Sequence, residues 1–205
     1  MIIAPEEYVD LETPYGPMRT YVLSPAAAGR YPGLVLFSEI FQVTGPIRRT
    51  AAFLAGHGYT GADGARMPGL GLLDLDTVAG PTRLIGNLVI DAELDGHRHR
   101  VVGFENHAGR TRLGAGSRPL GTVVHGHGNN GEDGGEGGVT GRVVGTYLHG
   151  PLLPKNPWLA DRLIAWGLEH RSGGAPVELA PLDDALEEAA HRAATARAAG
   201  GRSPR

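Results

Sequence analysis

An unbroken apolar run, GLVLF at residues 33–37, constrains the fold of this chain more than any other feature. Apolar and polar positions do not alternate in it, which is typical of a strand that is covered on both faces of a parallel α/β sheet. Residues 45–56 then show helical spacing, with Pro46 suited to the first turn. The predicted fold class is therefore α/β, with three layers and a mostly parallel sheet flanked by helices.

Further elements follow from alternation, turn residues and helical spacing. Between residues 126 and 141 the chain is acidic and rich in glycine, which predicts a loop. Residues 180–199 are rich in alanine and charge and hold few anchoring side chains, so a frayed helix is expected there, within a mobile tail at residues 172–205. Strands are expected at residues 7–12, 18–23, 85–94, 100–105, 120–125 and 143–148, and a helix at 157–169 with Asn156 as its N-cap.

The composition excludes several classes of protein. The chain has 205 residues, with 19 Lys and Arg against 22 Asp and Glu, and the net charge of −3 argues against a dedicated nucleic-acid binder. Because no apolar run is long enough to cross a bilayer and residues 1–7 lack the features of a signal peptide, we expect a cytoplasmic protein without membrane insertion. The sequence contains no cysteine, which removes disulfides, thiolate metal sites and any cysteine nucleophile from these 205 residues. Neither a cofactor nor a metal is expected.

The N-terminal part carries the strings YPGLVLFSEIF at residues 31–41 and LAGHGY at 54–59. With these strings, residues 1–59 resemble the start of the dienelactone hydrolases, which have the α/β-hydrolase fold. In that family the nucleophile elbow, acid and histidine all lie downstream of the matched part, and this chain has no Gly-x-Ser-x-Gly or Gly-x-Cys-x-Gly motif. Glu39 matches the family's glutamate beside the nucleophile, and Ser38 is a weak surrogate nucleophile.

Residues 60–171 resemble a different family. The matching strings are GLGLLD at 69–74, RLIGN at 83–87, GFENHAGRT at 103–111, GHGNNGED at 126–133 and GTYLHGPLLPKNP at 145–157. They are similar to the C-terminal half of the GatD-type glutaminase subunits of lipid II isoglutaminyl synthases, which are CobB/CobQ-like class I glutamine amidotransferases. This resemblance implies glutamine as substrate, a Mur-ligase-like partner subunit (MurT) in a heterodimer, and ammonia delivered to the D-glutamate of lipid II in cytoplasmic peptidoglycan synthesis.

The resemblance also implies site residues. His149 matches the catalytic histidine, which takes the thiol proton and returns it to departing ammonia. Arg83 matches an arginine that binds glutamine, and a guanidinium can grip a carboxylate with two parallel hydrogen bonds. Glu105 and Asp133 are candidate orienters of the imidazole, or solvated acids at the ends of strands or in loops. The family's cysteine elbow lies upstream of the matched region and is absent here, so the chain resembles a fusion of two half-domains and is predicted to be inactive alone.

Two alternatives to the glutaminase interpretation stay open: an α/β-hydrolase of the dienelactone hydrolase type, and a non-catalytic remnant that docks to a partner. The remaining patterns indicate less. The Gly-x-Gly-x-x-Gly match at residues 126–131 is followed by no helix, so a dinucleotide site is rejected. The histidine pairs 97/99 and 125/127 are interpreted as solvated, residues 132–136 as a solvated hairpin tip, and Trp158 and Trp166 as packing the last helix onto the sheet.

Overall fold

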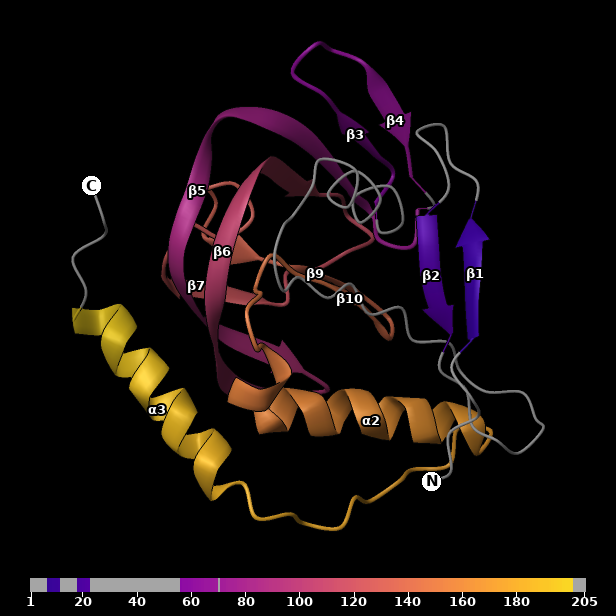
Figure 1. The fold of residues 1–205 in the computed structure, drawn as a ribbon, viewed down its shortest axis with the longest axis vertical. Helices are drawn as coiled ribbons and strands as arrows, with labels where there is room; N and C mark the ends of the chain where they lie inside the picture. The colour runs from indigo at the N-terminus through magenta and orange to yellow at the C-terminus, as the bar shows by residue number, and fades with distance from the viewer. Residues whose placement is uncertain (1–6, 12–17, 23–55, 70, 201–205) are drawn as a thin grey trace. The chain divides into compact units, whose positions relative to one another are not determined.

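The computed structural model describes residues 7–11, 18–22, 56–69 and 71–200 (Figure 1). The chain divides into two compact units, Met1–Leu36 and Phe37–Arg205. In the first unit, strands β1 (Glu7–Leu11) and β2 (Met18–Val22) pair antiparallel, which confirms the two strands expected there. The predicted strand at residues 33–37 and the predicted helix at residues 45–55 lie outside the described residues.

A long hairpin dominates the second unit. Strand β5 (Leu75–Leu94) pairs antiparallel with β6 (His97–Leu113), and in Figure 1 both strands curve strongly along their length. The turn between them is Asp95–Gly96, with φ values of 50° and 78°. Positive φ at both central residues is typical of the two-residue turns that match the twist of a hairpin. An aspartate followed by a glycine is a combination that tolerates this conformation.

Strand β5 is the central strand of a six-stranded sheet. Its order is β4-β3-β5-β7-β8, with β6 also paired to β5. A register shift interrupts the β5–β6 pairing between Ala79 and Leu84. Strands β9 and β10 form a separate antiparallel pair. The remaining strands are β3 (Gly58–Thr60), β4 (Arg66–Pro68), β7 (Gly121–His125), β8 (Gly135–Glu136), β9 (Gly138–Thr140) and β10 (Val143–Gly145).

Two α-helices, α2 (Pro157–Arg171) and α3 (Ala185–Gly200), flank the mixed sheet, and the predicted α/β class is confirmed. Parallel pairing is less common than expected among the described strands: β3 and β5 pair parallel, whereas the other pairings there are antiparallel. A tight turn such as the one between β5 and β6 can join only antiparallel strands, because parallel neighbours need a long crossover. Among the described helices, none is long and apolar enough to cross a membrane.

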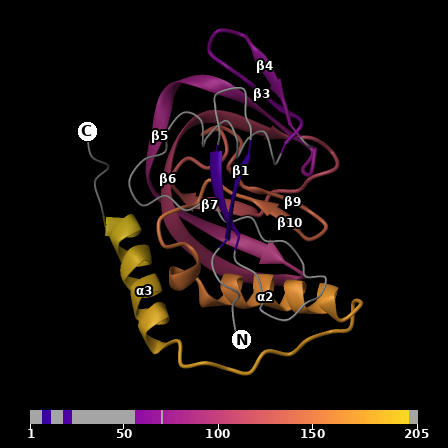
Figure 2. The same cartoon turned by 45° about the vertical axis from the view of Figure 1, so that its right-hand side comes forward.

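The two faces of the β5–β6 hairpin bury different clusters. Leu88 and Ile90 are fully buried in one cluster with Trp166 of α2. The residue between them, Val89, packs with Val102 against Ala198 of α3. Successive side chains of a strand point to opposite faces, so the two helices cover opposite sides of this hairpin. Figure 2 shows both helices against the sheet. The expected packing of the tryptophans is confirmed, since Trp166 is buried in this cluster and Trp158 packs against it.

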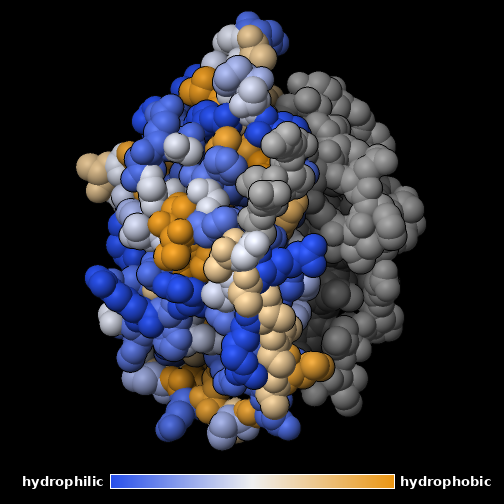
Figure 3. All heavy atoms as spheres, turned by 90° about the vertical axis from the view of Figure 1, so that its left-hand side faces the viewer, coloured by the Kyte–Doolittle hydropathy of each residue, from blue (hydrophilic) through white to orange (hydrophobic). Residues whose placement is uncertain are grey.

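The helix expected at residues 180–199 is present as α3, and it packs on the sheet. Ala198 is 1% exposed on the sheet, and the Nδ1 atom of His191 donates a hydrogen bond to the carbonyl of Lys155 at 2.9 Å. A face of small alanines needs no large anchors, because it lets the helix approach the two valines closely. Figure 3 views this side of the molecule and shows small apolar groups interleaved with charged ones.

Asn156 occupies the N-cap position of α2 as predicted, but its side chain makes no capping hydrogen bond. It pairs instead with the backbone of Val102 in β6, accepting from the N–H and donating to the carbonyl, both at 2.8 Å. Its amide also donates to the carbonyl of Leu152 at 2.6 Å. This buried amide therefore fastens the start of α2 to β6.

Replacing Asn156 by alanine is expected to lower the free energy of unfolding by about 2–3 kcal/mol, since it leaves buried backbone groups of Val102 without partners. Chemical denaturation measures the loss. Glu132→Ala is the control, because its ion pair with Arg112 is 65% exposed on both sides and is expected to contribute less than about 1 kcal/mol. Equal losses in the two variants would contradict the assignment.

Candidate active site

His149 lies beside the middle of β6. Strand β10 ends at Gly145, earlier than the predicted residue 148, and the chain continues to an isolated bridge between His149 and Phe104. The N–H of His149 donates to the carbonyl of Phe104 at 2.9 Å, and the N–H of Phe104 donates back at 3.1 Å. Their rings meet edge to face with centroids 5.5 Å apart. Backbone and ring contacts thus fix this histidine on the sheet.

The half-buried imidazole of His149 has a defined hydrogen-bond partner. Its Nδ1 atom lies 2.9 Å from the carbonyl oxygen of Tyr147. A carbonyl oxygen only accepts, so Nδ1 carries the hydrogen and Nε2 carries the lone pair of the neutral ring. A base with its lone pair fixed on one nitrogen is what proton transfer to and from a substrate requires.

Glu136 holds the segment that precedes His149. Its Oε1 atom accepts hydrogen bonds from the hydroxyl of Thr146 at 2.8 Å and from the N–H of Tyr147 at 2.7 Å. The Glu136 side chain is fully buried, and this burial raises its pKa above the usual value for glutamate. The expectation of a solvated tip at residues 132–136 is therefore wrong for Glu136.

Tyr147 stacks on His107, with ring centroids 3.5 Å apart and an interplanar angle of 5°. Its hydroxyl shares a hydrogen bond of 2.8 Å with Thr111, which shares another of 2.7 Å with Thr77. Burial raises the pKa of the Tyr147 hydroxyl. These contacts hold the Tyr147 ring against the two long strands, β5 and β6.

Glu105 is fully buried and is not a solvated acid. It accepts hydrogen bonds from the N–H and Nδ1 of His127, at 2.7 and 2.8 Å, and from the N–H of Gly128 at 3.0 Å. Burial by itself raises the pKa of Glu105, but His107, whose Nε2 lies 3.7 Å from the carboxylate, and the hydrogen bonds from His127 bring that pKa below its ordinary value. Glu105 thus organises the 127–128 loop, and none of its hydrogen bonds in the described structure goes to His149.

Asp133, the other candidate orienter, also serves its own loop. Its carboxylate accepts from the amide of Asn130 at 2.6 Å and from the N–H of Gly135 at 2.9 Å. These contacts account for both oxygens locally. Within the described residues, Asp133 makes no hydrogen bond to His149.

Arg83 lies at the register shift of β5 and binds Asn106 of β6. Its Nε donates to the side-chain oxygen of Asn106 at 2.7 Å, and its Nη2 donates to that oxygen and, at 2.8 Å, to the backbone carbonyl. Asn106 is two residues along β6 from Phe104, a separation of about 7 Å. Arg83 and His149 are thus both fastened to the same short stretch of β6.

The CobB/CobQ-like glutamine amidotransferase domain matches residues 53–157 of the chain. The chain belongs to this family. It is 42% identical over 132 residues to the lipid II isoglutaminyl synthase (glutamine-hydrolyzing) subunit GatD of Staphylococcus aureus, which covers 64% of this chain and 51% of that protein. The corresponding subunit of Streptococcus pneumoniae is 40% identical over 136 residues, covering 66% and 51%. The chain therefore spans about half the length of these relatives.

A second similarity covers a short segment. The "Putative carboxymethylenebutenolidase" of Saccharomyces cerevisiae is 48% identical over 59 residues, which are 26% of this chain and 22% of the yeast protein. The chain thus combines similarity to two families, as the sequence analysis expected. Ser38 and Glu39, the residues that the analysis singled out in the N-terminal part, lie outside the described residues.

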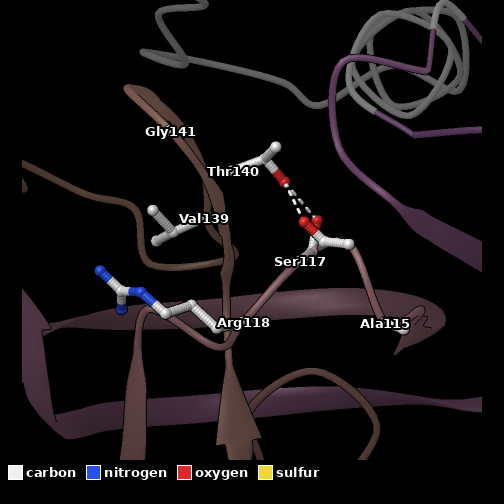
Figure 4. Close-up of a pocket in the computed structure, with 7 residues that line it drawn as sticks. Ala115, Ser117, Arg118, Val139, Thr140 and Gly141 are labelled. Atoms are coloured by element: carbon white, nitrogen blue, oxygen red, sulfur yellow. Dashed lines mark hydrogen bonds between the residues drawn. The ribbon is translucent and has the colours of Figure 1, made fainter.

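A shallow groove of about 410 Å³ lies elsewhere in this amidotransferase-family chain, lined by residues 115–118 and 139–141 (Figure 4). The hydroxyls of Ser117 and Thr140 share a hydrogen bond of 2.6 Å in it. Arg118 donates to the carbonyl of Glu93 at 2.9 Å. Neither His149 nor Arg83 is among the residues that line this groove.

The histidine pairs are not equally solvated. His99 stacks on Trp158 with ring centroids 4.2 Å apart, and burial lowers its pKa. His127 binds the buried Glu105, as described above. No three His, Asp or Glu side chains among the described residues are placed to hold a metal ion.

The sequence analysis missed the buried Glu136 and the stack of His107 on Tyr147. Glycines around Glu136 are the one signal that could have indicated tight packing. Gly137, with φ of 68°, brings its backbone against Leu120, which would lie 2.8 Å from an added Cβ. Only glycine fits such a close approach, so this stretch is packed against the core.

Proposed function

We propose that this chain is the histidine-bearing half of a GatD-like glutaminase subunit. In this proposal glutamine is the substrate, and its ammonia serves amidation of the D-glutamate of lipid II in cytoplasmic peptidoglycan synthesis. A Mur-ligase-like subunit, MurT, is the partner. The observation that supports it best concerns His149. Its lone pair is fixed on Nε2 by the hydrogen bond from Nδ1 to the carbonyl of Tyr147, and its backbone pairs with the same stretch of β6 that Arg83 contacts.

The chemistry divides between two groups that this chain supplies and one that it lacks. A thiolate adds to the carboxamide carbon of glutamine while Nε2 of His149 holds the thiol proton, and that proton leaves with ammonia. Nη1 of Arg83, which makes no hydrogen bond to Asn106, donates to the substrate α-carboxylate. Because the 205 residues contain no cysteine, the thiolate comes from outside them, and these residues alone are inactive.

Reconstitution tests this proposal. Adding the cysteine-bearing N-terminal half of a GatD relative is expected to produce ammonia release from glutamine, and His149→Ala in this chain is expected to abolish it. Addition of the same half with its cysteine changed to alanine is the matched control. Ammonia release that is unaffected by His149→Ala would contradict the proposed role.

Arg83→Lys is expected to raise the KM for glutamine about tenfold in the reconstituted enzyme with little change in kcat. A lysine cannot bind both oxygens of Asn106 and at the same time donate to the α-carboxylate as Nη1 does, and this contact is equally strong in ground and transition states. Steady-state kinetics over a range of glutamine concentrations measure both constants. Arg110→Lys is the control, since Arg110 binds backbone carbonyls of its own hairpin. An unchanged KM in Arg83→Lys would contradict substrate binding.

A second candidate function, an α/β-hydrolase of the dienelactone hydrolase type, rests on the 59-residue similarity to the yeast protein. It predicts hydrolysis of a chromogenic ester that disappears in Ser38→Ala. A third, non-catalytic candidate is a docking remnant. It is favoured by two partly exposed apolar side chains: Ile85, 45% exposed on β5 with Arg83, and Phe104, 36% exposed on β6, which pairs with His149. Binding of the MurT-type subunit without turnover would single it out.

A further inference from the structure

We propose that Glu136 is a positioning residue for His149, and that it acts through the backbone of Tyr147 to keep the imidazole lone pair on Nε2. The proposal rests on the proposed function in one respect, namely that His149 is the base of the site. Glu136 itself touches neither the imidazole nor, in this account, the substrate.

A continuous set of hydrogen bonds carries the effect. Glu136 Oε1 accepts from the N–H of Tyr147 at 2.7 Å, and the carbonyl of the same Tyr147 accepts from Nδ1 of His149 at 2.9 Å. The two bonds involve the peptide groups on either side of one residue. They therefore fix the backbone dihedrals of Tyr147, and with them the direction of the carbonyl that selects the tautomer of His149.

A second bond ties the neighbouring residues to the same oxygen. The hydroxyl of Thr146 donates to Glu136 Oε1 at 2.8 Å and accepts from the N–H of Leu148 at 3.0 Å. The hydroxyl can do both at once, because it has one hydrogen and two lone pairs. One carboxyl oxygen thus organises residues 146–148, directly before His149.

The other oxygen, Oε2, shows in which form Glu136 does this. It is buried without a hydrogen-bond partner among the described residues, as is the Nε2 atom of the neighbouring His107. Oε1 already accepts two hydrogen bonds, so the acid hydrogen belongs on Oε2. Burial raises the pKa of Glu136 most, and the charge of Glu105 raises it further, while the two hydrogen bonds and the charge of His107 lower it. The net effect is a raised pKa, so Glu136 keeps its proton to a higher pH than an exposed glutamate does.

A neutral acid suits this role better than a carboxylate. Glu105 already places one ionised carboxylate in the same interior, and a second buried charge there is repelled by it. The protonated form keeps Oε1 as an acceptor for Thr146 and Tyr147 without that repulsion. Glutamine is nearly the same shape and also neutral, so it is the conservative replacement.

NMR of the full chain labelled with 15N-histidine tests the proposal. Long-range correlations between the carbon-bound ring hydrogens and the two ring nitrogens distinguish the two neutral tautomers. The His149 signals are assigned by their loss in His149→Gln. We expect the Nδ1–H form in the unmodified chain and in Glu136→Gln, and a mixture of both forms in Glu136→Leu. Glu132→Gln, on the exposed part of the same loop, is the control.

Retention of the Nδ1–H form in folded Glu136→Leu would overturn the proposal, and so would its loss in Glu136→Gln. Where Glu136→Leu fails to fold, Thr146→Val replaces it, since it removes one of the two donors and leaves the acid in place. That variant is expected to shift His149 partly towards the mixture, and an unchanged spectrum counts against the proposal. Because the tautomer is read without turnover, failure of the reconstituted glutaminase reaction leaves this test intact, and the reverse also holds.

Discussion

Replacing Glu105 by alanine is expected to lower the free energy of unfolding by about 3–5 kcal/mol, a loss typical of a buried charged group whose partners remain behind. The change leaves the backbone N–H groups of His127 and Gly128 unpaired in the interior, and it removes the partner of the His127 ring. Urea denaturation at pH 7 measures this loss.

Glu93→Ala is the matched control for Glu105→Ala. Glu93 lies on β5, and its ion pair with Arg98 is 44% and 81% exposed, so its loss is expected to cost less than about 1 kcal/mol. The pKa of Glu105 is lowered in the folded state, so its contribution is present above the unfolded pKa of glutamate and is lost as the pH falls through the lower, folded value. Similar losses of unfolding free energy in both variants would contradict this assignment. So would a difference in stability between Glu105→Ala and the unmodified chain that stays the same as the pH is lowered.

Glu136→Gln is expected to become progressively more stable than the unmodified chain as the pH rises. The pKa of Glu136 is raised in the folded state, so above the unfolded pKa of about 4.3 the folded chain holds a proton that the unfolded chain has released. The unmodified chain therefore loses about 1.4 kcal/mol per pH unit from this group until the folded pKa is reached, and glutamine does not titrate. The divergence ends at the pH that equals the folded pKa of Glu136.

Urea denaturation of both chains at several pH values between 5 and 7 measures this divergence. Subtracting one curve from the other cancels the contributions of the other titrating groups, including Glu105, as long as they behave alike in both chains. Glu132→Gln, in which an exposed acid of the same loop is neutralised, is expected to show no such slope. A constant difference between Glu136→Gln and the unmodified chain would show that Glu136 is ionised in the fold.

Local patterns predicted some elements of this fold well. The alternating apolar positions from residue 85 to 94 and the spacing of α2 were sufficient, because burial of those side chains is decided locally. The rest of β5 and β6 was not predicted. Residues 75–84 include Gly80 and Pro81, which disfavour a strand, and residues 106–113 are mostly polar. Their strand conformation comes from pairing with each other. The docking of α3 escaped for a similar reason, since alanines carry no signal of what they will pack against.

The candidate site was predicted in the same uneven way. The strings around His149 and Arg83 indicated both residues, but only the tertiary pairing shows that both are fastened to β6. Glu105 was a poor candidate orienter for a reason that alternation explains: its neighbour Phe104 meets His149, so the Glu105 side chain points to the other face of the strand. The burial of Glu136 depends on Thr146 and Tyr147, and no spacing in the sequence relates these residues.

Ammonia release by the purified chain incubated with glutamine shows whether His149 is a base without a nucleophile among these 205 residues. We expect no release above that of His149→Ala, because the sequence has no cysteine for the imidazole to activate. Release from the chain alone that disappears in His149→Ala would contradict the account, since it would mean that another of these 205 residues attacks the carboxamide.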